Sequence, residues 1–243
     1  MAIPDLLYLA LIAIGLLVDH FVLWPTFLRQ SQVDPGRARS FLWSSWMILL
    51  WALVAACIAL WLFEGRAWEP LKLEPPRGWR LWVAITLVST LMITYARTVI
   101  RIARSERPRR VKMGRPGVER LVPHNRSELR SWIAVSVSAG FCEEFIFRGY
   151  LIWAFQPVFG LWGAAAFSVI LFGAAHAYQG AMGVFATGAV GAVLTLVVLA
   201  LGSVLPAMAL HAIVDIGQGL VAWLVLRGRS AVTQNPEIGT AEV

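Results

Sequence analysis

Charged residues are scarce in this chain. Only 14% of its 243 residues are charged and 58% are hydrophobic, whereas an average globular domain carries roughly 25% charged residues. Such a sequence has too little polar surface for a soluble enzyme, a disordered chain or a nucleic-acid-binding domain. We therefore expect a polytopic membrane protein that does not bind nucleic acid, despite its net charge of +7.

Cysteine is equally scarce, with two residues in the chain. Cys57 and Cys142 both lie inside apolar runs, and their spacing suits neither a disulfide framework nor a zinc knuckle. We interpret both as small buried residues. The sequence also has no internal repeat, and no basic segment precedes its first apolar run, so we expect no cleavable signal peptide.

Long apolar runs are what the sequence has in abundance. Helices and closed barrels are the structures that satisfy their backbone in lipid, and these runs are continuous rather than alternating, which favours helices. About 20 residues cross a hydrocarbon core of about 30 Å. We predict an all-α bundle of about seven transmembrane helices with the site inside it, the spans being 4–28, 41–63, 79–100, 131–153, 158–178, 182–201 and 203–225.

Basic residues gather in alternate loops. Segment 101–130 holds ten Lys and Arg residues, segment 29–40 holds three, and the tail has Arg227 and Arg229. With seven spans these segments share one side of the membrane, which the positive-inside rule makes cytoplasmic. We expect a multi-pass protein of the plasma membrane (the inner membrane in a bacterium), with its N-terminus outside and its C-terminus in the cytoplasm. Segment 101–130 could instead be a surface helix on anionic lipid, but we favour its role as a topology signal.

The spans divide the chain into three expected parts. Residues 1–127 hold spans 1–3 and the basic loop, and residues 128–228 hold the core that carries the motifs described next. Residues 229–243 form a polar tail that we expect to be flexible.

Ionisable residues inside the spans are functional candidates, because a charge in mid-membrane costs several kcal/mol. They are Asp19, His20, Glu143, Glu144, Arg148, His176, His211 and Asp215. Asp19 and His20 either line a cavity or lie near the outer third of span 1 and bond to neighbours. We favour the second interpretation.

Span 4 carries two adjacent glutamates followed by an arginine. Glu144 and Arg148 are spaced i, i+4, so they share a helical face and can pair. Glu143 points about 100° away and has no local cation, which suits a general base. The alternative is a buried ion pair that only holds helices together.

Spans 5 and 7 each place a histidine one turn from a partner. Phe172 and His176 share a face of span 5, and His211 and Asp215 share a face of span 7. Together with Glu143, these residues supply a water activator, an imidazole and further polar groups for a hydrolytic site. Glu143, His176, His211 and Asp215 are equally a credible set of zinc ligands. No cofactor is certain from the sequence, and zinc is the candidate.

Depth in the membrane gives a partial check. Glu143 lies roughly 18 Å from the inner start of span 4, and His211 lies at a similar depth in span 7. His176 falls near the inner end of span 5, which disagrees by more than about 10 Å. Span 5 therefore continues past Gly180, is broken, or is staggered.

The three motifs resemble those of the CAAX-processing and bacteriocin-processing (Abi-type) intramembrane endopeptidases. The family pattern is EExxxR, FxxxH and HxxxN or HxxxD on separate helices, and the resemblance covers residues 128–225. It implies that Glu143 and His176 activate a water, and that Arg148 holds Glu144. It further implies that His211 and position 215 stabilise the oxyanion. An ionised Asp215 accepts and does not donate, so it has to be protonated, orient His211 or bind a metal.

The function that we expect from this resemblance is hydrolysis of a peptide bond near the end of a membrane-associated peptide or protein. The enzyme is a glutamate-type or a zinc endopeptidase, and the substrate is prenylated or bacteriocin-like. Two alternatives remain, a non-catalytic immunity or scaffold protein on the same fold and a proton-coupled transporter. A transporter would show internal symmetry, which the sequence lacks.

Overall fold

The structure is a computed structural model that describes residues 2–104 and 120–234, with side chains as far as residue 227. These residues form helices and turns, and among them there is no strand. Six of their helices are long and apolar enough to cross a membrane. The predicted all-α polytopic bundle is therefore confirmed.

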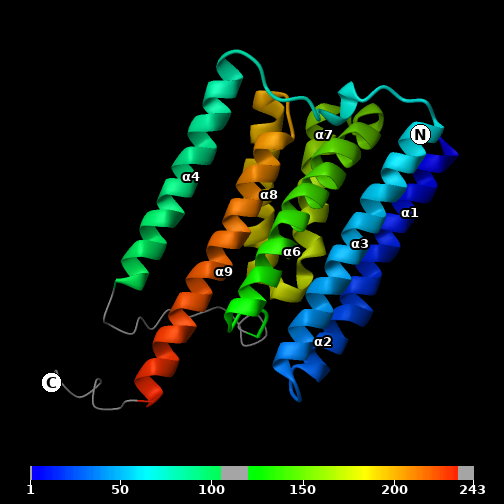
Figure 1. Cartoon of the computed structure of the whole chain (residues 1–243). Coiled ribbons are helices and arrows are strands. Elements are labelled where there is room, and N and C mark those ends of the chain that lie inside the picture. The colour runs from blue at the N-terminus through cyan, green and yellow to red at the C-terminus, as the bar shows by residue number, and fades with distance from the viewer. Residues whose placement is uncertain (1, 105–119, 235–243) are drawn as a thin grey trace.

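The helices follow one another along the chain and run roughly parallel to a common axis (Figure 1). Two stretches are π-helical, η1 and η3, and each continues directly into the α-helices on both sides. The elements are α1 (Ile3–Val18), η1 (Asp19–Leu23), α2 (Trp24–Gln30), α3 (Pro35–Phe63), η2 (Glu69–Leu71), α4 (Trp79–Ala103), α6 (Arg126–Glu144), η3 (Phe145–Leu151), α7 (Ile152–Ala175), η4 (Ala177–Gln179), α8 (Gly180–Leu201) and α9 (Leu205–Gln234).

The helical run Arg126–Ala175 folds back on itself. At 50 residues it would be about 75 Å long if straight, far more than the hydrocarbon core needs. Gly160 interrupts it with φ 67° and ψ 172°, three residues after Pro157, and the chain reverses there (Figure 1). Because one of the six helices consists of two antiparallel segments, the number of long helical segments agrees with the seven or so that the sequence predicts.

The predicted fifth span, 158–178, is shorter than expected. α7 ends at Ala175, a single 3₁₀ turn follows, and α8 begins at Gly180, where φ is 75°. This turn lies above the lower ends of α2 and α9 in Figure 1. Of the alternatives for this span, a broken and staggered helix is the correct one. The break after Ala175 places His176 at the depth of the other site residues.

At the lower end of the bundle α3 and α6 begin and α4 ends, whereas α1 begins at the upper end (Figure 1). Arg29, Arg37, Arg39, Arg120 and Arg126 lie on the segments at the lower end, and Arg66, Lys72, Arg77 and Arg80 lie on the segment at the upper end. α3 and α6 begin at this lower end with side-chain caps, in which Asp34 and Asn125 accept backbone N–H bonds of 2.9 Å. A buried fork from Arg39 to Glu128, with distances of 2.8 and 3.0 Å, ties the two helix starts together. Which end faces the cytoplasm stays a prediction.

Two of the predicted segments fall partly outside the described residues. Of the basic loop, residues 105–119 lie outside them. Of the polar tail, α9 extends through Gln234, and residues 235–243 lie outside.

α6 and α9 pack at very short range, which brings their polar residues together. A methyl group on Gly140 would lie 2.8 Å from the backbone nitrogen of Ala212 and 2.9 Å from the backbone oxygen of Met208. The indole of Trp132 donates a 2.8 Å hydrogen bond to the backbone oxygen of Asp215. The glycine permits the contact and the tryptophan sets the register of the two helices.

Candidate active site

A cavity of about 390 Å³ opens inside the bundle, between α1 and α3 on one side and α6 to α9 on the other. Its wall on α1 and α3 is mostly apolar. Four predicted site residues line it, namely Glu143, His176, His211 and Asp215. The structure therefore brings together residues that lie on three separate helical segments.

The remaining two predicted residues lie behind the cavity wall. Glu144 and Arg148 both have side chains that are 0% exposed, and Arg148 Nη1 donates to Glu144 Oε1 at 2.8 Å, as the i, i+4 spacing predicts. Arg148 also donates to the backbone oxygen of Gly191 at 3.0 Å and to Thr195 Oγ1 at 3.3 Å. Its guanidinium lies 4.1 Å from the ring centroid of Phe172.

Close packing of α8 makes this arginine site possible. A methyl group on Gly191 would lie 2.8 Å from the Phe172 ring and 2.9 Å from Arg148 Nη2. Only glycine lets the α8 backbone approach closely enough for its carbonyl to accept from the arginine. Arg148 is thereby held on three sides.

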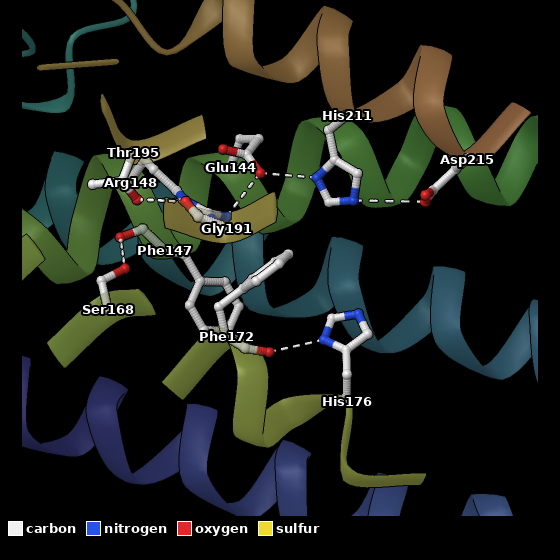
Figure 2. A network of polar contacts seen from close by, with 10 residues as sticks. All are labelled: Glu144, Phe147, Arg148, Ser168, Phe172, His176, Gly191, Thr195, His211 and Asp215. Atoms are coloured by element: carbon white, nitrogen blue, oxygen red, sulfur yellow. Dashed lines mark hydrogen bonds and ion pairs between the residues drawn. The ribbon is translucent and has the colours of Figure 1, made fainter. Parts of the chain in front are cut away.

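Glu144 connects the arginine to the histidine of α9. The same oxygen that accepts from Arg148 also lies 2.8 Å from His211 Nδ1, so Glu144 sits between the two side chains (Figure 2). An ionised carboxylate accepts, and Nδ1 therefore carries a proton. The contact joins residues 67 positions apart, and no local spacing in the sequence predicts it.

The other nitrogen of His211 faces Asp215. Nε2 lies 3.6 Å from Asp215 Oδ2, which is an ion-pair distance and too long for a hydrogen bond. The ring is thus fixed at Nδ1 and free at Nε2 to bond a third group. Asp215 is in place to orient His211, one of the three roles open to it from the sequence.

His176 is oriented by its own helix. Nδ1 lies 2.8 Å from the backbone oxygen of Phe172, which can only accept, so Nδ1 carries the proton and Nε2 keeps its lone pair. The ring packs against Phe172 at 4.9 Å between centroids, and His211 packs against the same phenyl ring at 5.8 Å. Both imidazoles lie on the same side of Phe172 (Figure 2).

Glu143 lines the cavity and is only partly buried. Its Oε2 atom is buried and has no hydrogen-bond partner among the described residues. A buried carboxylate oxygen without a partner is costly. The position therefore suits a water or a polar group of a ligand.

The predicted zinc set was tested against this arrangement. Among residues 2–104 and 120–234, no group of three His, Cys, Asp or Glu side chains is arranged to hold a metal ion. The four residues do not fit a metal as they stand, and no step below passes through one.

For Asp19 the favoured interpretation is correct only in part, because this residue bonds a neighbour and also lines the cavity. It lies at the start of η1 and lines the cavity, where its Oδ1 accepts a 2.6 Å hydrogen bond from the indole of Trp46. His20 is exposed and packs against Phe21 at 4.7 Å between centroids. The π-helical turn at η1 shifts the helical register, which an apolar run in a sequence does not reveal.

The fold and the site define a polytopic helical membrane protein with a glutamate and two histidines gathered inside its bundle. Residues 125–217 match the model of the family described as Rce1-like, type II CAAX prenyl endopeptidase Rce1-like. The match spans all three motifs and confirms the resemblance of this part of the chain to the CAAX-processing family, which is a family of hydrolases. No curated protein and no solved structure matches the chain significantly.

Proposed function

We propose that the protein is an intramembrane endopeptidase that cuts near the end of a membrane-associated peptide or protein by a glutamate-activated water. The observation that carries this proposal is the unpartnered Glu143 oxygen in a cavity that it shares with His176 and His211. The family match supports the reaction class. The apolar wall on α1 and α3 suits a substrate that is held in the bilayer, whether prenylated or bacteriocin-like.

In the proposed reaction a water binds between Glu143 and His176. It donates one hydrogen bond to the carboxylate and one to the free Nε2 lone pair of the imidazole. Glu143 takes the first proton as the water oxygen attacks the peptide carbonyl carbon. The same carboxylic acid then delivers that proton to the nitrogen of the leaving amine when the C–N bond breaks.

His211 stabilises the negative charge that develops on the carbonyl oxygen. It carries protons on both nitrogens in this step, donating Nδ1–H to Glu144 and Nε2–H to the oxyanion. Asp215, at 3.6 Å from Nε2, balances the charge of the imidazolium. The oxyanion is therefore met by a donor whose direction Glu144 has already fixed.

Glu144 and Arg148 act as positioning residues in this proposal. Neither lines the cavity, and their contact with the reaction passes through His211 Nδ1. We further propose that the basic lower end of the bundle faces the cytoplasm, in a plasma membrane or bacterial inner membrane, and that the substrate enters from there.

Cleavage of a peptide panel by the purified protein in proteoliposomes tests the proposal. The panel holds membrane-associated peptides with and without a prenyl group, and mass spectrometry locates the cut. We expect the wild type and the exposed-loop control Glu69→Gln to cleave, and Glu143→Gln to be inactive while folded, because an amide cannot take a proton. Cleavage should persist with a chelator, and its loss would favour the zinc type. Peptide binding without any cleavage would favour the non-catalytic alternative.

A further inference from the structure

A polar layer of the cavity wall, formed by Asp19, Trp46 and Ser136, takes no part in the proposed reaction. Trp46 on α3 lies between Trp43, which packs against Trp132 at 5.7 Å between centroids, and Trp51, which bonds Ser138 at 3.1 Å. Trp46 therefore stands beside the part of α6 that holds Ser136. Asp19 bonds Trp46 and so belongs to the same layer.

On α9 this layer borders Asp215, which the proposed reaction places beside His211. Trp132 bonds the Asp215 backbone and Gly140 touches Ala212, so Ser136, midway between them on α6, stands level with the turn that ends at Asp215. Asp19, Ser136 and Asp215 thus surround one section of the cavity. Along α6, Ser136 lies seven residues, or about 10 Å, from Glu143.

No Lys or Arg among the described residues pairs with Asp19, whereas Asp215 already lies against His211. The cavity lining contains the carboxylates Asp19, Glu143 and Asp215, and none of the described lining residues is Lys or Arg. Asp19 forms no ion pair with a cation among the described residues, although the chain as a whole has a net charge of +7. A cation brought by a ligand would fill this gap.

Aromatic faces and an orphan hydroxyl complete the section. Trp46 packs against Tyr178 at 5.6 Å between centroids, and both line the cavity beside Asp19. Aromatic faces next to a carboxylate attract ammonium and guanidinium groups. Ser136 is 1% exposed and lines the cavity, and its Oγ has no hydrogen-bond partner among the described residues, which indicates that a polar group of a ligand or a water satisfies it.

We propose that Asp19, flanked by Trp46 and Tyr178 in the cavity wall, is a specificity-determining residue that binds a Lys or Arg side chain of the substrate. This inference rests on the proposed endopeptidase function and adds a class of substrate to it.

A charge scan of the substrate tests this subsite. In a peptide that the wild type cleaves, Lys replaces Gln at each of the positions around the cut, with the protein in proteoliposomes. We expect one position where Lys raises kcat/KM about tenfold over Gln. Asp19→Asn keeps an oxygen for the Trp46 indole and should bring this ratio close to one.

A charge reversal and a matched control sharpen the test. Asp19→Lys should prefer Glu over Lys at the same peptide position, whereas Glu69→Gln, which removes an exposed carboxylate outside the cavity, should keep the wild-type ratio. An unchanged ratio in Asp19→Asn, or no position that prefers Lys, would overturn the subsite while leaving the endopeptidase intact.

Binding separates the two proposals if no peptide is cleaved. Fluorescent Lys and Gln peptides are then titrated onto Glu143→Gln with and without Asp19→Asn. Tighter binding of the Lys peptide that disappears with Asp19→Asn supports the subsite even where the reaction fails. Equal binding of both peptides contradicts it.

Discussion

Replacing Arg148 by alanine should cost the protein both stability and activity. The change removes three hydrogen bonds, of 2.8, 3.0 and 3.3 Å, and takes the guanidinium from the face of Phe172. It leaves Glu144, whose side chain is 0% exposed, without its cation. Breaking a buried pair costs about 3–5 kcal/mol, and the lost ring contact adds to this. At about 2–4 °C per kcal/mol, the melting temperature should fall by about 6–20 °C.

This fall in melting temperature is measured by thermal unfolding of detergent-purified variants, followed by their tryptophan fluorescence. The double variant with Glu144→Gln and Arg148→Met removes both charges and should recover much of the stability. It should stay poorly active, because His211 loses the carboxylate that orients it. Recovery of stability without recovery of activity separates the two roles of Glu144.

Arg39→Ala is the matched control, because it also breaks a buried fork to a glutamate, with side chains 5% and 9% exposed. It lies at the lower end of the bundle and contacts neither His211 nor the cavity. We expect it to lower the melting temperature while the activity per folded molecule stays near that of the wild type. If Arg148→Ala melts like the wild type, the buried pair does not stabilise the fold and the reasoning is wrong.

Three further predictions concern the oxyanion donor, the packing of α6 and α9, and the topology. His211→Asn should lower kcat much more than it changes KM, because the donor acts on charge that is present only in the transition state; a change confined to KM in steady-state kinetics would refute this. Gly140→Ala should destabilise the bundle in thermal unfolding, since its methyl group would lie 2.8 Å from the Ala212 nitrogen, and a wild-type melting curve would contradict the packing. In intact cells an impermeant thiol reagent should label Glu69→Cys and spare Gln32→Cys, and the reverse pattern would invert the orientation.

Much of the fold could be predicted from the sequence, because an apolar run of about 20 residues in lipid satisfies its backbone only as a helix or in a closed barrel. The crossings and their order follow from the apolar runs alone. The pairing of Glu144 with Arg148 follows from helical spacing. The gathering of the two histidines and Glu143 in one cavity was expected from the motifs, since polar side chains in a bundle face its interior.

The remaining features depend on backbone irregularities and long-range contacts. The depth of His176 is set by the turn at Gly180, with φ 75°, and an apolar sequence does not show where a span stops short. The contact between Glu144 and His211 depends on the register of α6 against α9. Asp19 reaches the cavity from a π-helical turn, whose register shift no periodicity in the sequence reports.

Isotope incorporation tests the central claim most directly. The purified protein cleaves a membrane-associated peptide in H₂¹⁸O, and mass spectrometry reads the new C-terminus of the N-terminal fragment. We expect one ¹⁸O atom in that carboxylate with the wild type, and no product with Glu143→Gln. Product from Glu143→Gln at a rate near that of the wild type would contradict the role of Glu143 as the base that activates the water.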